Sequence, residues 1–173
     1  MATLEIRQLG PDDEAAFLAG LDSWADEDPA WHTFTWTEGM THDEHLRRLS
    51  DDFHGRNLKN DRVLHTMLYG FLEGVIVGRC SVRHELNDHL REWGGHIGYG
   101  VAPPFRKRGF GKQLFQAGRE HLKSLGKDKA FLVCEKRNEA SRKLIEGAGG
   151  VLQDEVIDPA DQEVVLRFWV PLV

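Results

Sequence analysis

The sequence has few of the features that mark secreted, membrane or multidomain proteins. Among its 173 residues only Cys80 and Cys134 are cysteines, too few for a disulfide framework, so we expect a reducing, cytoplasmic setting. No apolar run approaches the roughly 20 residues of a membrane span, and the N-terminal stretch lacks the apolar core of a signal peptide. Without an internal repeat, low-complexity tract or linker, we expect residues 1–173 to form one domain with no membrane partner.

Basic charge is scarce as well, and it is gathered in one segment. The net charge is −6, and residues 1–60 alone hold 13 acids against 5 Lys or Arg. Residues 103–129 reverse the balance, with 8 Lys or Arg and 2 acids. One basic segment in an acidic chain argues against nucleic-acid binding, which favours a broad basic face. It fits a local site for a polyanion, beside an acidic region that either attracts a cation or forms solvated helix faces.

The basic segment lies in a turn between a predicted strand and a predicted helix. Ile97, Tyr99 and Val101 alternate on one face of the strand, and the helical pattern runs over 109–126. Residues 106–112 therefore combine glycines and four Lys or Arg with the start of a helix. Unpaired N–H groups and the helix dipole favour an anion at that place. The segment is predicted to hold a phosphate group.

The glycine pattern distinguishes between known phosphate motifs. A nucleotide P-loop would need Ser or Thr at Gln113, and a dinucleotide fingerprint would need Gly at Leu114. Arg106, Gly109 and Gly111 are spaced as Arg, two residues, Gly, one residue, Gly. This spacing resembles the pyrophosphate motif of the GNAT-superfamily N-acetyltransferases, which is Arg or Gln, two residues, Gly, one residue, then Gly or Ala. The alternative is a solvated basic turn with incidental glycines.

The predicted elements follow the order βααβββαβαββ. Strands are expected at about residues 4–9, 63–72, 75–82, 96–101, 130–134, 151–157 and 164–170, and helices at about 15–21, 42–53, 109–125 and 138–147. This order predicts an α/β (α+β) domain with a mixed, mostly antiparallel sheet of about seven strands and about four helices. It is also the GNAT order, and the resemblance covers most of the chain from about Val63 onward. A subgroup known only as "predicted acetyltransferases" is similar at 83–86 and 94–99.

The resemblance implies acetyl-CoA as the donor and direct transfer to an amine of a small molecule or peptide. Residues 61–173 would form the cofactor-binding core, and residues 1–60 would shape the acceptor pocket. The central strand would have to splay from its neighbour near residues 98–101, where two glycines favour a bulge. Asn138 could equally be only a helix N-cap. The implied cofactor-binding residues are Tyr99, Gly100, Val101, Arg106, Lys107, Arg108, Gly109, Phe110, Gly111, Lys112, Asn138 and Ser141.

The sequence departs from the family at both proton-transfer positions. Ile145 lies where the resemblance places a tyrosine that acts as the general acid, and Gly95 lies at a common position for the general base. His84, Glu85 and Tyr99 are therefore the candidates for catalysis, although Tyr99 could equally pack against the cofactor. His96 is a further alternative, but its place in the strand favours a half-buried structural role. The departures leave a second hypothesis open, namely a CoA-binding module with little or no catalytic activity. No metal is expected.

The irregular stretch over residues 22–38 combines acids with aromatic rings. Acids attract an ammonium group, and indole faces hold one by cation–π contact. We therefore predict a cationic amine acceptor that contacts Asp26, Glu27, Trp31 and Trp36. The alternative is that the tryptophans pack under the loop while the acids face water. The sequence identifies neither the acceptor nor the oligomeric state, monomer or homodimer.

Overall fold

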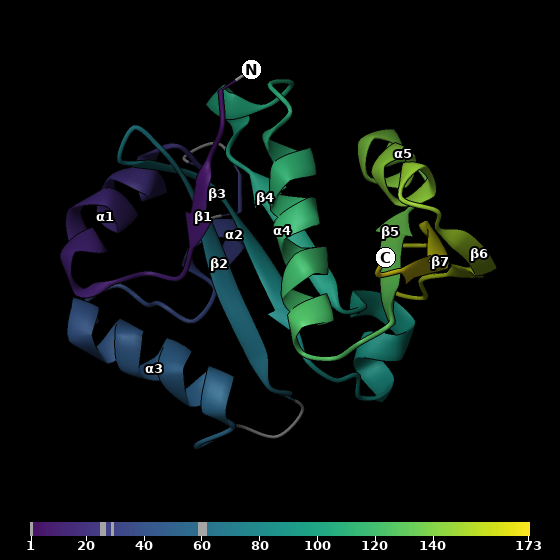
Figure 1. The fold of residues 1–173 in the computed structure, drawn as a ribbon, viewed down its shortest axis with the longest axis horizontal. Helices are drawn as coiled ribbons and strands as arrows, with labels where there is room; N and C mark the ends of the chain where they lie inside the picture. The colour runs from purple at the N-terminus through teal and green to yellow at the C-terminus, as the bar shows by residue number, and fades with distance from the viewer. Residues whose placement is uncertain (1, 25–26, 29, 59–61) are drawn as a thin grey trace.

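The computed structural model describes residues 2–24, 27–28, 30–58 and 62–173 and contains two separate antiparallel sheets (Figure 1). The first sheet has the order β1-β2-β3-β4, with β1 at Glu5–Arg7, β2 at His65–Leu72, β3 at Val75–Arg83 and β4 at Ile97–Val101. The second has the order β5-β7-β6, with β5 at Lys129–Glu135, β6 at Val151–Ile157 and β7 at Val164–Pro171. The predicted α+β class is confirmed, with the seven strands divided between two sheets.

The two sheets meet where β4 and β5 begin. The His96 N–H donates to the Phe131 carbonyl at 2.7 Å, and the Phe131 N–H donates to His96 Nδ1 at 2.9 Å. Beyond this contact the strands separate. The expected bulge in β4 is wrong, because the β3–β4 register runs without a shift from Gly78 opposite Val101 to Val82 opposite Ile97. The splay therefore comes from the loss of β4–β5 pairing and not from a bulge.

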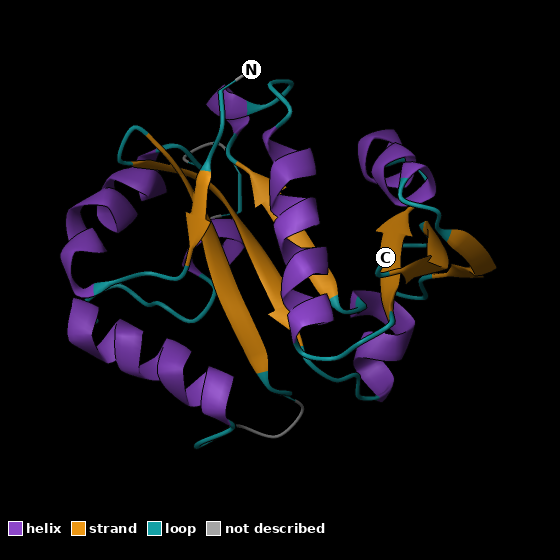
Figure 2. Cartoon of the chain, viewed as in Figure 1, coloured by secondary structure: helices purple, strands orange, loops and turns teal. Residues whose placement is uncertain are grey.

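Helices cover both faces of the first sheet (Figure 2). On one face lie α1 (Glu14–Asp22), α2 (Ala30–Thr33) and α3 (His42–His54); on the other lies α4 (Phe110–Ser124). The last helix, α5 (Glu139–Gly147), packs against β5 of the second sheet. The expected order is confirmed, and the described residues add four elements too short to give a periodic pattern. These are α2, 3-10 turns at Pro11–Asp13 and Pro103–Phe105, and a π-helical turn at Leu90–Gly94. No helix in the described part of the chain is long and apolar enough to cross a membrane.

Alternation along β2 separates two apolar cores. Met67, Tyr69 and Phe71 pack with Phe17 on the side of α1 and α3. Leu68 points to the opposite face, into the core that contains α4 and the second sheet. A strand places successive side chains on opposite faces, so one strand supplies both cores and fixes the first sheet between two helical layers.

Local signals read from the sequence set the ends of α3. Thr41 Oγ1 accepts from the Glu44 N–H at 3.3 Å, and Glu44 Oε2 accepts from the Thr41 N–H at 2.9 Å. This reciprocal capping box confirms the predicted start of the helix. Gly55 ends it in the left-handed conformation, with φ 70°.

Several histidines are enclosed in these cores without a charged role. His32, His45, His65 and His96 are each less than 9% exposed. Burial lowers the pKa of each to about 4, because an imidazolium would lose its hydration there. All four are therefore neutral in the folded protein at pH 7.

These histidines predict acid sensitivity in a defined window. Their folded-state pKa lies below the unfolded value of about 6.5, so the unfolded chain binds protons first. Their contribution is fully present above pH 6.5 and is lost as the pH falls toward 4, by up to about 3 kcal/mol per histidine. Urea unfolding at pH 7, 6, 5 and 4.5 should show a midpoint that falls steadily. A flat midpoint over this range would contradict neutral burial of the four rings.

Candidate active site

A cleft opens where β4 and β5 diverge. Its outer part has a volume of about 760 Å³ and lies between β4, the turn before α4 and the start of α5. Its inner part, of about 290 Å³, reaches between the two sheets to the β6–β7 turn. The two parts share four lining residues, which are Trp31, Tyr99, Asn138 and Ser141.

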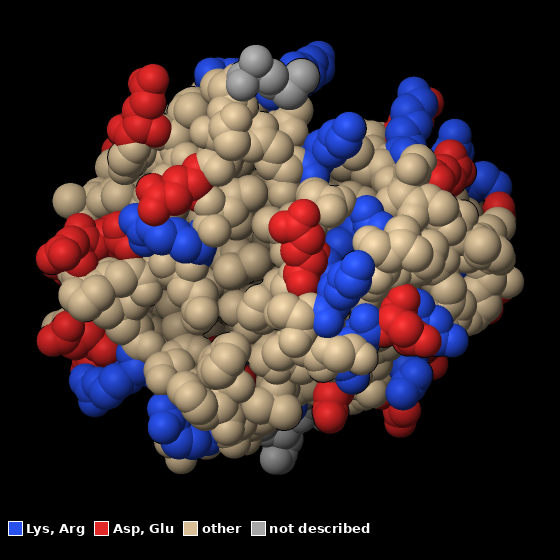
Figure 3. Space-filling model, in the orientation of Figure 1, with Lys and Arg blue, Asp and Glu red and all other residues tan. Residues whose placement is uncertain are grey.

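The outer part contains the predicted phosphate site. Gly109 precedes α4 in the left-handed conformation, with φ 82°, and turns the chain into the helix. The first turn of α4 follows, where N–H groups lack intrahelical acceptors. Gly111 adds no side chain to this backbone, and a Cβ at its position would lie 3.7 Å from the Tyr99 ring, which is an ordinary contact distance. Lys107 and Lys112 also line this part. On the face in Figure 3, basic side chains lie along the strip between α4 and α5.

The two arginines of the motif point in different directions. Arg106 forms a bidentate ion pair with Glu27, with both N···O distances at 2.6 Å, and its Nε donates to the Val101 carbonyl at 2.9 Å. The Arg106 guanidinium holds the pKa of the Glu27 carboxyl below its usual range. Arg108 instead stacks over the ring of Phe110, 4.9 Å from its centroid. The Glu27 carboxylate thus occupies the guanidinium face that a phosphate would use.

The walls of the cleft are β4 and α5. One edge of β4 pairs with β3, and among the described residues no strand pairs with its other edge. The free edge at Tyr99–Val101 can take an extended ligand by strand addition. Asn138 caps α5, because its Oδ1 accepts from the Ser141 N–H at 3.1 Å. It therefore has the capping role and also lines the cleft.

The inner part is acidic and aromatic. Trp31 and Trp93 line it together with carboxylates from the end of β5 and from the turn between β6 and β7. Arg137 bridges two of these carboxylates, at 2.7 Å and 2.9 Å. The sequence alone does not identify this group, because the stretch between β6 and β7 has only the pattern of a hairpin turn. The acids are Glu135, Asp158, Asp161 and Glu163.

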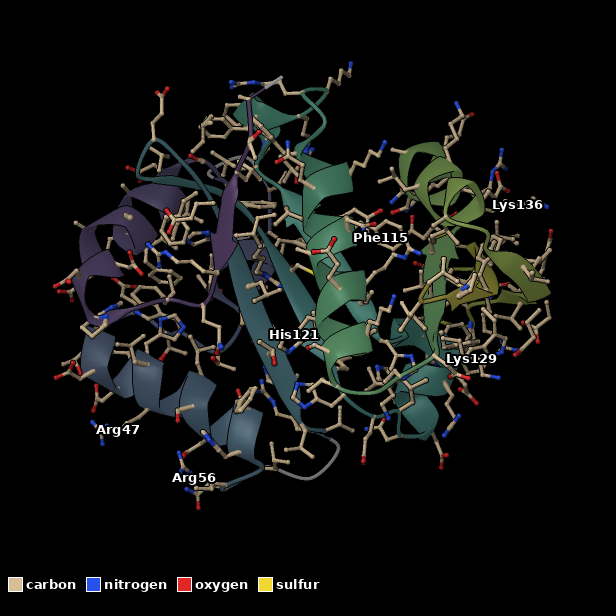
Figure 4. All side chains as sticks on the ribbon, viewed as in Figure 1. Arg47, Arg56, Phe115, His121, Lys129 and Lys136 are labelled. Carbon is tan, nitrogen blue, oxygen red and sulfur yellow. The ribbon has the colours of Figure 1, made fainter. Side chains whose placement is uncertain are left out.

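Two of the three catalytic candidates lie outside this cleft. His84 Nε2 is hydrogen-bonded to Thr66 Oγ1 at 2.8 Å, and His121 Nε2 is bonded to the same hydroxyl at 2.8 Å. Figure 4 places His121 on the side of α4 that faces β2, away from the second sheet. Neither His84 nor the exposed Glu85 is among the described residues that line the cleft. The structure brings only the third candidate, Tyr99, to the site.

The acceptor candidates are also divided. Trp31 lines both parts of the cleft, and Glu27 lines the outer part. Trp36 lies elsewhere, packed against Phe17 with ring centroids 5.8 Å apart. Asp26 lies outside the described residues. The alternative of tryptophans packed under the loop thus holds for Trp36 but not for Trp31.

The two departures from the family pattern have different surroundings. Gly95 is pressed against β5, where a Cβ would lie 2.7 Å from the Phe131 carbonyl oxygen. Its position has no room for a base. Ile145 is buried at 3% exposure and lines the inner part of the cleft, so an apolar side chain stands there.

Comparison with known proteins agrees with this geometry. The model of the acetyltransferase (GNAT) family matches residues 21–149. The chain belongs to the GNAT family of acetyltransferases. The expected class of enzyme, an acetyltransferase of the GNAT family, is confirmed at the level of this family. No curated protein matches the chain by sequence.

Solved structures show the same fold at low sequence identity. An N-acetyltransferase from Staphylococcus aureus Mu50 has a TM-score of 0.64 and 16% identity, covering 99% of this chain and 100% of that one. YncA from Salmonella typhimurium, described as an acetyltransferase and solved with acetyl-CoA, has a TM-score of 0.62 and 16% identity, over 99% and 95%. A spermidine N-acetyltransferase chimera from Vibrio cholerae and hSSAT has a TM-score of 0.63 and 17% identity, over 99% and 96%.

The placement of Gly111 predicts a specific loss of CoA binding. Gly111→Asp adds a carboxylate where phosphate would approach, and should weaken CoA binding at least about tenfold. An acid in the first turn favours the helix, so the melting temperature should not fall. Gly111→Ala is the matched control and should keep affinity within about threefold. Isothermal titration calorimetry measures the CoA affinity of both variants. Equal affinities would contradict the placement of the phosphate at this turn.

The Glu27–Arg106 pair predicts a gain in affinity. If the carboxylate competes with phosphate for Arg106, Glu27→Gln should tighten CoA binding by about two- to fivefold at low salt. The gain should shrink at high ionic strength. Glu38→Gln, which removes an exposed acid from the same N-terminal region, should change nothing. Weaker CoA binding in Glu27→Gln would mean that Glu27 orients Arg106 instead of competing for it.

Proposed function

We propose that the chain transfers the acetyl group of acetyl-CoA directly to a cationic amine. One observation carries the proposal: a single cleft joins a phosphate-type helix start to an acidic, tryptophan-lined end. A donor rich in phosphate fits the first and an ammonium group fits the second. One of the structural relatives is a spermidine N-acetyltransferase chimera, and spermidine is an amine of this chemistry.

The donor fits the outer part residue by residue. Backbone N–H groups from Lys107 to Lys112, with the Lys107 and Lys112 ammonium groups, would hold the pyrophosphate. The free edge of β4 at Tyr99–Val101 would hold the pantetheine arm. The thioester would then lie near Ser141, where the outer and inner parts meet.

The reaction needs a neutral amine and a stabilised oxyanion. A backbone N–H near Val101 is available to the carbonyl oxygen, because no strand of the described residues pairs with that edge of β4. The acids of the inner part attract the ammonium form and can accept its proton through water. His84 and Glu85 have no part in this proposal, because they lie outside the cleft.

The test is an acetyl-transfer screen that follows thiol release from acetyl-CoA. Polyamines, aminoglycosides, amino acids and peptide N-termini would be compared with neutral and anionic amines. We expect turnover with cationic acceptors. CoA binding without any acetyl transfer would favour the alternative of a binding module.

The two buried, unpaired cysteines support the cytoplasm as the proposed location.

The acidic inner end predicts a selective change in KM. Asp161→Asn with Glu163→Gln should raise KM for a cationic amine by about tenfold and leave KM for acetyl-CoA alone. The salt dependence of kcat/KM should fall at the same time. Asp12→Asn with Glu14→Gln removes two exposed acids at the start of α1 and is the matched control. An equal rise in the control pair would assign the effect to net charge and contradict a local acceptor site.

A further inference from the structure

The reacting atoms must lie where the donor part and the acceptor part of the cleft meet. Four residues line both parts, and two of them, Tyr99 and Ser141, have a hydroxyl proton. Transfer of the acetyl group leaves a thiolate on CoA, which is a better leaving group when a proton donor is in reach. The two hydroxyls lie at the place where that sulfur would be released.

The phenol of Tyr99 is held from both sides of the cleft. Its hydroxyl lies 2.9 Å from Ser141 Oγ, which joins β4 to α5 across the opening. Its ring packs against Phe115 of α4, with centroids 5.6 Å apart. Figure 4 shows Phe115 on the side of α4 that faces α5 and the second sheet. The ring is therefore fixed while its hydroxyl reaches the cleft.

By its bond to Ser141, the Tyr99 hydroxyl lies at the face of α5 that includes Ile145, the position where the family pattern has a tyrosine as the acid. Ser141 and Ile145 are four residues apart, so they lie on the same face of the helix, one turn from each other. Ile145 cannot transfer a proton. The phenol of Tyr99 reaches this face of α5 from β4, on the opposite wall of the cleft. A tyrosine hydroxyl therefore lies near the position that Ile145 occupies.

Other groups near the sulfur position are less suitable. The carboxylates of the inner part are acceptors of protons when ionised. Cys80 and Cys134 are the titratable neighbours of the phenol, and burial raises their pKa values to about 12 and about 11. Cys80 is fully buried, and Cys134 lines the inner part but is not among the described residues that line the outer part.

We propose that Tyr99 donates the proton to the departing CoA sulfur and that Ser141 positions its hydroxyl. The proposal rests on the proposed function. The amine lone pair forms the C–N bond, the C–S bond breaks, and its electron pair goes to sulfur. Sulfur takes the phenol proton, and the phenolate regains one from solvent through Ser141, which is half-buried. The proton lost by the nitrogen goes to water or to the acids of the inner part.

The first experiment compares the chain's only two tyrosines. Tyr99→Phe keeps the ring and removes the hydroxyl, and should lower kcat about 10²-fold while KM for acetyl-CoA stays within threefold. Tyr69→Phe is the matched control. Tyr69 is fully buried in the other core. Among the described residues its hydroxyl has no hydrogen-bond partner, and Tyr69 does not line the cleft. Its loss should leave kcat unchanged. Ser141→Ala should lower kcat by less than Tyr99→Phe.

A second experiment separates proton donation from packing. In the Tyr69→Phe background Tyr99 is the only tyrosine, so 3,5-difluorotyrosine supplied during expression enters at position 99 alone. Burial raises the pKa of Tyr99 to about 12, so the unmodified enzyme should show no alkaline limb in kcat that belongs to this phenol below pH 10. Fluorine lowers the phenol pKa, and a limb should then move into the measured range. A ring that only packs would leave the profile unchanged.

The outcomes are distinguishable from failure of the proposed function. Absence of acetyl transfer by the wild-type chain to every amine would remove the function itself. With an active wild type, equal kcat in Tyr99→Phe and Tyr69→Phe would overturn the role of Tyr99 and leave the function standing. A lower kcat in Tyr99→Phe with an unchanged pH profile in the fluorinated enzyme would also overturn proton donation.

Discussion

The site depends on one contact between two strands. His96 and Phe131 exchange hydrogen bonds at the start of β4 and β5, and Gly95 lets the two backbones approach because it has no side chain. Pairing stops there, so the strands diverge, and no strand in the described part of the chain pairs with this edge of β4. The cleft, its free backbone and its access to both sheets follow from this single junction.

Charge is divided along the cleft in the direction of the proposed reaction. The outer part has the start of α4 with Lys107 and Lys112, while the inner part has the carboxylates near the β6–β7 turn. A polyanionic donor and a cationic acceptor are thereby attracted to opposite ends. Glu27 adds a local exception, because its carboxylate binds Arg106 at the donor end.

The sequence predicts the proposed donor half of the site and much less of the proposed acceptor half. Gly109 and Gly111 have a local meaning, since a turn into a helix start needs them whatever surrounds it. Strand alternation and the Thr41 capping box are local in the same way. Glu163 and Glu135 join the cleft only through the pairing of β5 with β7, which no local pattern encodes.

The misplaced candidates show the same limit. His84 is a candidate in the sequence because it follows a strand end. In the folded chain its ring is hydrogen-bonded to Thr66 Oγ1, the same hydroxyl that His121 contacts, away from the cleft. Trp36 and Trp31 lie in the same irregular stretch of the sequence, and no local pattern distinguishes them. In the structure Trp36 packs on Phe17, whereas Trp31 lines the cleft. Tyr99 is a candidate in the sequence because it lies close to the expected position of the base, but its bond to Ser141 requires the folded α5.

Amide hydrogen exchange of the wild-type chain with and without CoA tests most directly whether the donor lies along this edge. Bound CoA should slow exchange at the β4 edge, residues 98–101, and at the turn and helix start, residues 107–112. The β6–β7 turn, residues 158–163, should stay unchanged until a cationic amine is added. Protection centred on the β6–β7 turn with CoA alone, or none at 98–101 and 107–112, would contradict this placement of donor and acceptor.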